Sequence, residues 1–135
     1  MDTLSKRERS TRMGLVKSKN TSPEMVVRAF VYKLGYRYRL HGAKLPGRPD
    51  LVFAGRRKVI FVHGCFWHRH NRCSLARLPK SHREFWLPKL ENNRARDAVN
   101  RRALTRLGWT SMVIWECDLR DPIKAMVKIL VFLEE

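Results

Sequence analysis

The stretch LPGRPDLVFAGRRKVIFVHGCFWH, residues 45–68, decides the fold of this chain. It holds two short, largely apolar runs, at 51–53 and 58–63, and each run follows a turn that contains glycine. Runs of this length between turn residues are typical of strands, and the second predicts a central strand that is buried on both faces. We expect the two strands to pair antiparallel, which would carry Asp50 towards residues 62–63.

The segments before this pair begin with a helix. Thr21-Ser22-Pro23-Glu24 has the make-up of a helix start, apolar residues then recur at helical spacing, and Gly35 is a stop signal. Residues 36–40 alternate aromatic or apolar side chains with basic ones, as a half-buried strand does. Residues 1–20 are polar and basic, and we expect an arm that orders on a phosphate backbone, with a frayed terminus as the alternative.

The segments after the pair alternate again between helix and strand. Residues 84–107 show helical periodicity, which Pro88 is expected to interrupt, 109–115 form an apolar strand, and 122–133 form an amphipathic helix. The order of elements predicts one α/β domain over residues 21–135, with a mixed central β-sheet flanked by helices.

The chain is strongly basic. Its 135 residues include 29 Lys and Arg but only 12 Asp and Glu, a formal net charge of +17, while 44% hydrophobic residues argue for a folded domain. The commonest partner of such a domain is nucleic acid, with a ribosomal-type protein or a binder of anionic membranes as alternatives. No apolar run has the length of a transmembrane helix and residues 1–7 lack a secretory stretch, so we expect a cytoplasmic location.

All three cysteines fit one metal site. Three of the candidate ligands share the irregular segment 64–83, and the fourth follows a predicted strand: Cys65, His70, Cys73 and Cys117. Three thiolates and one imidazole form a closed tetrahedral set typical of structural Zn²⁺, which would order a segment that has few apolar residues. His68 and His82 compete for the fourth position, and burial of the cysteines as small hydrophobic side chains is the alternative.

Asp50 and His63 predict a second site, for a harder cation. In the expected antiparallel pair, the Asp50 carboxylate lies near the backbone carbonyl of Val62 and the His63 imidazole. Carboxylate and carbonyl oxygens, completed by waters and a phosphate, suit Mg²⁺. The alternative for Asp50 is a turn residue whose carboxylate accepts backbone N–H groups.

Several blocks spread over about residues 9–120 carry a family resemblance. They are LPGRPD at 45–50, FVHGCFWH at 61–68, EFW at 84–86, Asn93 with Arg96-Asp97, and Gly108-Trp109 with VIWEC at 113–117. Together they closely resemble the very-short-patch-repair (Vsr) mismatch endonucleases. The resemblance implies a restriction-endonuclease-like PD-(D/E)xK fold that lacks the usual catalytic lysine. It also implies a bacterial, nucleoid-associated DNA-repair enzyme.

The activity that the resemblance implies is the nicking of one strand of double-stranded DNA on the 5′ side of the T in a T:G mismatch, with Mg²⁺. Asp50 and the backbone carbonyl of Val62 would bind that Mg²⁺, and Glu24 would hold metal-bound waters. The family's zinc ligands map onto Cys65, His70, Cys73 and Cys117, and this chain has one extra residue between the histidine and the second cysteine.

Histidines would perform the proton chemistry. By resemblance, His68 would be the general base, oriented by Asp97, and His63 would lie beside the scissile phosphate. Histidine suits the role because it titrates near neutrality, and an aspartate partner fixes its tautomer. The alternative is that both are ordinary strand-end and loop histidines, or zinc ligands.

Large aromatic rings near the irregular segment are candidate wedges between base pairs. The resemblance implies four intercalating residues: Phe66, Trp67, Trp86 and, from the arm, Met13. Trp109 and Trp115 lie in an apolar strand and are expected in the core, whereas core and wedge are evenly matched for Trp86. The basic residues expected to contact phosphates are Arg48, Arg69, Arg72, Arg94 and Arg96.

Three functions are therefore open: a T:G mismatch-nicking enzyme, a nuclease of the same fold without T:G preference, and a non-catalytic zinc-containing DNA-binding module. The combined presence of Asp50, His63, His68 and Asp97 favours an enzyme, because DNA binding needs none of them. We expect a monomer that acts on mismatched duplex, with mismatch-repair proteins as further partners.

Overall fold

The structure is a computed structural model that describes residues 21–135. Its main elements are α2 (Ser22–Lys33), β1 (Arg39–Leu40), β2 (Leu51–Phe53), β3 (Lys58–His63), α3 (Arg83–Arg106), β4 (Thr110–Trp115) and α4 (Pro122–Glu134). This order confirms the predicted α/β fold. The expected arm of residues 1–20, with Met13, lies outside the described residues, so the division into arm and domain stays a prediction.

One mixed sheet organises the chain, with strand order β1-β2-β3-β4. β2 and β3 pair antiparallel, with Leu51 opposite Ile60, as the sequence predicts. β3 and β4 pair parallel, with His63 opposite Trp115, and the crossover between them contains α3. The functional residues of the sheet therefore collect where β2 begins and where β3 and β4 end.

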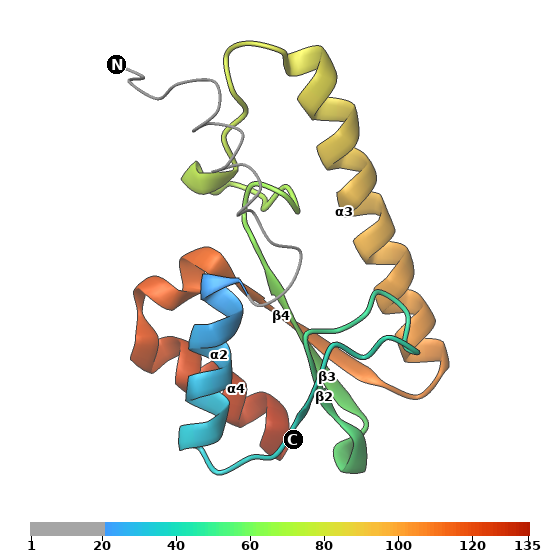
Figure 1. Ribbon diagram of the computed structural model, residues 1–135, viewed down its shortest axis with the longest axis vertical. Helices are drawn as coiled ribbons and strands as arrows, with labels where there is room; N and C mark the ends of the chain where they lie inside the picture. The colour runs from blue at the N-terminus through green and yellow to red at the C-terminus, as the bar shows by residue number, and fades with distance from the viewer. Residues whose placement is uncertain (1–20) are drawn as a thin grey trace, which may run out of the picture.

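Helices cover both faces of this sheet: α2 and α4 lie on one side and α3 on the other (Figure 1). The alternation of side chains along β3 explains the layers, because Ile60 and Val62 join the core under α2 and α4. Val59 and Phe61 face the opposite way and pack with Leu104 of α3. All six residues of β3 are buried, which confirms the prediction of a central strand covered on both faces.

Helix α3 differs from its prediction, because it continues through Pro88. Proline removes one intrahelical hydrogen bond and crowds the preceding turn. Here the carbonyl that loses its partner is that of Glu84, in the first turn of the helix, where residues 83–85 are exposed to solvent. Only Leu90 and Leu104 of its 24 residues are buried, so the amino-terminal half projects beyond the sheet beside the segment 64–82 (Figure 1).

The first strand is also shorter than predicted. Residues 36–40 were expected to be extended along the sheet, but only Arg39 and Leu40 pair with β2. Tyr36 and Tyr38 instead pack against the core beneath α2 and α4. Within residues 21–135 no helix is long and apolar enough to cross a membrane.

Candidate active site and metal centre

An acidic pocket lies at the start of β2. The Oδ2 of Asp50 accepts the backbone N–H of Val62 at 2.6 Å, so the antiparallel pair brings these residues together as predicted. Glu24, in the first turn of α2 and only 2% exposed, hydrogen-bonds to the same aspartate. Burial, with a smaller contribution from the Glu24 carboxylate, raises the pKa of Asp50 to about 7, while the Val62 N–H opposes the shift.

This crowding of two carboxylates fits a divalent cation. A cation that binds between two adjacent carboxylates offsets their mutual repulsion. Oxygen donors of this kind suit Mg²⁺ rather than a softer metal. Asp50 also accepts the backbone N–H of Val62, the alternative role predicted for it. This hydrogen bond is compatible with metal binding by the same carboxylate.

Two basic residues next to Glu24 were not anticipated. Nη2 of Arg28, one helical turn on, lies 3.3 Å from Glu24 Oε2. Nε2 of His41 lies 3.5 Å from the same oxygen, and its backbone N–H bonds to the carbonyl of Asp50. The spacing of Arg28 from Glu24 was visible in the sequence, whereas the approach of His41 depends on the turn before β2, which no periodicity reveals.

The predicted pair of His68 and Asp97 is formed. His68 Nδ1 lies 2.6 Å from Asp97 Oδ2, with one residue in the loop after β3 and the other on α3. Their side chains are 29% and 25% exposed, so the pair is reachable from solvent. Because the carboxylate accepts at Nδ1, the other ring nitrogen of a neutral imidazole is left as a proton acceptor. His68 also lies close enough to Asp50 to lower the pKa of that carboxyl.

His63 is held neutral at the end of β3. Its ring stacks on His68 with centroids 3.7 Å apart and an interplanar angle of 2°. Burial lowers the pKa of His63 to about 3, and the adjacent His68 acts in the same direction. Among the described residues, its buried Nδ1 has no hydrogen-bond partner.

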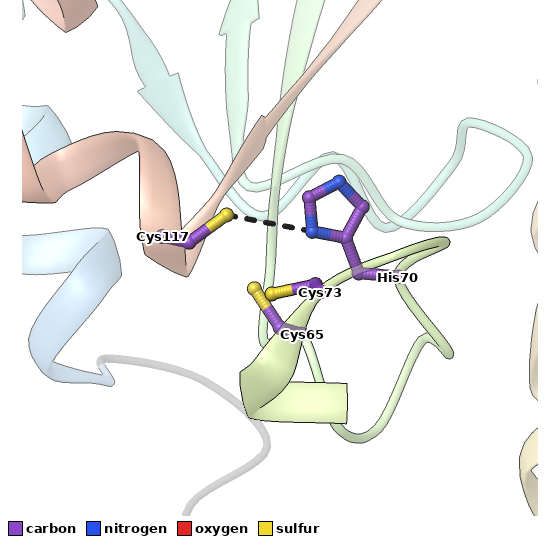
Figure 2. A group of neighbouring side chains, drawn as sticks. All are labelled: Cys65, His70, Cys73 and Cys117. Carbon is purple, nitrogen blue, oxygen red and sulfur yellow. Dashed lines mark hydrogen bonds between the residues drawn. The ribbon is translucent and has the colours of Figure 1, made fainter. Parts of the chain in front are cut away.

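The cysteine cluster forms as the sequence predicts, and it includes His70 rather than His68 or His82. One potential ligand atom from each of four residues lies within 4.8 Å of all the others: Cys65, His70, Cys73 and Cys117. Figure 2 shows the three sulfur atoms and the His70 ring converging, with Nδ1 of His70 3.4 Å from Cys117 Sγ. The backbone is left-handed at Arg69 and Arg72, between Cys65 and Cys73.

The donor set of this cluster fits zinc. The four groups are the soft and borderline ligands of a closed tetrahedral site. Burial raises the pKa of the Cys65 thiol to about 12, a cost that a bound cation reverses because it favours the thiolate. The two competing histidines are accounted for: His68 bonds to Asp97, and His82 precedes α3 as its N-cap.

Trp115 contacts residues of both sites, a role that the sequence did not predict. It was expected in the core, and it does pack against the apolar cluster beneath α3. Its ring also stacks on His70 at 3.9 Å and meets His63 edge-on at 5.2 Å. A row of rings, His68–His63–Trp115–His70, therefore runs from the acidic pocket to the cysteine cluster. The row depends on the parallel register of β3 and β4, which the sequence does not reveal.

The three described aromatic residues predicted as wedges form one cluster. Phe66, Trp67 and Trp86 meet edge-to-face, with centroids 5.2, 5.5 and 5.8 Å apart. All three are partly exposed, so the open question for Trp86 is answered in part: it is packed against other rings but not in the sheet core. Nδ2 of Asn93 on α3 donates to the Trp67 carbonyl at 3.1 Å, which fixes this cluster beside Asp97.

A basic α/β domain that holds a buried glutamate and a half-buried aspartate at one end of its sheet, beside an Asp-oriented histidine, has the make-up of a nuclease. Comparison with known proteins identifies the family: the model for DNA mismatch endonuclease Vsr matches residues 1–74, more than half of the chain. The chain belongs to the Vsr family of DNA endonucleases.

Curated relatives agree with this assignment. The type II nicking enzyme V.XorIIP of Xanthomonas oryzae pv. oryzae is 52% identical over 120 residues, which cover 89% of this chain and 88% of the relative. The type II nicking enzyme V.NmeAIP of Neisseria meningitidis is 39% identical over 89% of this chain and 85% of the relative. The DNA mismatch endonuclease Vsr of Escherichia coli is 40% identical over 88% of this chain and 76% of the relative.

Proposed function

We propose that this endonuclease nicks one strand of duplex DNA on the 5′ side of the T in a T:G mismatch, by Mg²⁺-dependent hydrolysis. The observation that carries the proposal is the 2.6 Å contact between His68 and Asp97, next to the pocket of Asp50 and Glu24. A proton acceptor beside a pocket suited to a hard cation is what hydrolysis of a phosphodiester requires.

The chain's own residues would act as follows. Asp97 accepts a hydrogen bond from Nδ1–H of His68, so the opposite ring nitrogen is the one that takes the proton of the attacking water. His63 stays neutral beside the scissile phosphate and supports the His68 ring by stacking. Asp50, with the Val62 carbonyl, would bind Mg²⁺, and Glu24 would hold its waters. When bound, Mg²⁺ supplies positive charge that stabilises the negative charge of the reacting phosphate.

Recognition of the mismatch would depend on the cluster of Phe66, Trp67 and Trp86. Exposed rings on a braced segment can enter a base stack, and a mispair lowers the free energy needed to unstack it. Zinc bound by Cys65, His70, Cys73 and Cys117 would supply the bracing, because the first three lie in the same segment as Phe66 and Trp67 and Cys117 ties that segment to the end of β4. Mismatch specificity is also the activity named for the Escherichia coli relative. The proposed contribution of Met13 falls outside the described residues.

The second candidate is a nicking endonuclease without T:G preference. It is favoured by the relatives that are named as nicking enzymes, with no mismatch in their names. The two candidates share the chemistry of the acidic pocket and differ only in what the aromatic cluster recognises.

One assay separates them. T:G, other-mismatch and fully paired duplexes, labelled on each strand in turn, are incubated with Mg²⁺, and the nicked end is mapped. Nicking of the T strand of T:G duplex only supports the proposal, equal nicking of paired duplex supports the second candidate, and no nicking of any duplex refutes both. Asp50→Ala should abolish nicking while DNA binding persists, and Glu135→Ala, which removes an exposed carboxylate, serves as the matched control.

A further inference from the structure

A hollow of about 510 Å³ lies beside the cysteine cluster, between the segment 69–77 and α3. His70 and Cys73 contribute to its wall, so two candidate zinc ligands shape it directly. The remaining charged residues of the wall are four arginines and one glutamate: Arg69, Arg72, Arg77, Arg94 and Glu91.

The charges of this hollow are unbalanced. Arg69 is held in place, because its Nε lies 3.2 Å from Glu91 Oε1 and its Nη1 donates to the Ala76 carbonyl at 3.1 Å. Within residues 21–135, the guanidinium groups of Arg72, Arg77 and Arg94 form no ion pair. Four positive charges around one carboxylate leave a local excess of three, which repel one another until an anion enters.

The position of the hollow relates it to the active site. Arg94 lies one turn before Asp97 on α3, about 4.5 Å along the helix axis at the usual rise of 1.5 Å per residue. Arg69 directly follows His68 in the chain. An anion bound among these arginines would therefore lie on the same side of the molecule as the His68–Asp97 pair.

We propose that this hollow binds the sugar-phosphate backbone of the DNA next to the scissile phosphate, and that the cysteine cluster maintains its shape. Arginine forks match phosphate geometry, and the hollow is larger than one phosphate group needs, which favours a length of backbone over a lone anion. Backbone contacts fix the register of the duplex without reading its sequence. The inference rests on DNA being the substrate, but not on T:G preference.

Binding of a labelled duplex, with zinc present and no Mg²⁺ added, tests this directly. The variant is Arg77→Gln/Arg94→Gln, since both residues lie in ordinary backbone and glutamine is a good helix former at position 94. The control is Lys33→Gln/Lys124→Gln, which removes the same charge from α2 and α4. Zinc content and melting temperature are measured for both proteins.

If the two arginines each contact a phosphate, the slope of log binding constant against log salt becomes less steep by about 1.8 in the variant. The control should keep the wild-type slope, and affinity for T:G and paired duplex should fall equally. The same slope in variant and control would overturn the proposal. Inorganic phosphate added at constant ionic strength gives a second test. If it removes the difference in DNA affinity between variant and wild type, the hollow is a site for free anions and the proposal is also overturned. No nicking is measured, so a failure of the proposed T:G activity gives a separate result.

Discussion

The acidic pocket and the cysteine cluster lie at the same end of the sheet but are assembled differently. Glu24, Asp50 and Asp97 come from α2, the start of β2 and α3, so the pocket exists only when these elements are packed. Three potential ligands of the cluster lie in the segment 64–82, and the fourth, Cys117, lies two residues after β4. The pocket thus depends on the whole fold, whereas the cluster organises one segment of it.

The two regions also differ in the chemistry of their donors. The pocket has carboxylates and partly exposed imidazoles, which exchange protons and accept hard cations. The cluster has thiols and one imidazole in a closed set with no open position for a substrate. The comparison predicts that damage to the first region removes catalysis and leaves the fold intact, while damage to the second loosens the segment that carries His68.

The largest effect is expected for Asp50→Asn. Nicking should fall by at least about 10³-fold, because loss of a metal ligand forfeits several kcal/mol of transition-state stabilisation. The asparagine oxygen can still accept the Val62 N–H, so zinc content and the circular dichroism spectrum should match wild type. Nicking within tenfold of wild type in a single-turnover assay would remove Asp50 from the metal site.

Asp97→Asn should reduce nicking by about 10²–10³-fold, within the range for general base catalysis. The amide can donate to Nδ1 of His68, which would leave the opposite nitrogen protonated and unable to accept from water. The single-turnover rate should show the loss while DNA affinity and zinc content stay constant. A comparable loss in affinity would mean that Asp97 acts through the shape of α3 instead of through His68.

Cys117→Ser tests the other side of the comparison. It should lower the zinc content and reduce nicking by about 10²-fold, because displacement of a catalytic group by about 1 Å costs that much. The segment 64–82 should then be cut first in limited proteolysis, with the sheet core intact. Chelation of zinc from wild type should give the same pattern, and His82→Asn, outside the cluster, should give neither change. A variant with full zinc and full activity would contradict the closed set.

Much of this comparison could be predicted from the sequence. Turn and strand patterns predicted the antiparallel pair that brings Asp50 to Val62, and the use of every cysteine predicted the cluster. What escaped prediction depends on register and on long-range approach. Trp115 looked like a core residue because its partners, His63 and His70, are set by the parallel pairing of β3 and β4. The arginine hollow likewise needs α3 to lie beside the segment 69–77.

Trp115→Leu is expected to affect both regions at once. Leucine keeps an apolar side chain in the core but removes the ring that contacts both His63 and His70. Zinc affinity and nicking should each fall by about tenfold, the lower end of effects for residues that support metal ligands. Trp109→Leu, a tryptophan in the same apolar cluster, is the control. If only stability changes, the row of rings is packing alone.

The smallest effects concern the pH dependence of stability, to which Asp50 and His63 contribute with opposite signs. Asp50 has a pKa raised from 3.8 to about 7 by burial, so between these values the folded state binds more protons and stability rises as pH falls. His63 has a pKa lowered from 6.5 to about 3 by burial, so there the unfolded state binds more protons and stability falls as pH falls. Between pH 5 and 6 both groups are active, and their contributions to the wild-type slope nearly cancel.

Single variants should expose each contribution. Relative to wild type, the free energy of unfolding of His63→Gln should rise as pH falls from 6 to 5, and that of Asp50→Asn should fall, each by about 1.4 kcal/mol per pH unit. Urea unfolding without Mg²⁺ measures both, and differences from wild type cancel the titration of the cysteine cluster, which all three proteins share. If the unfolding free energies of the two variants change with pH in the same direction, the folded protein does not combine a protonated Asp50 with a neutral His63 in this pH range.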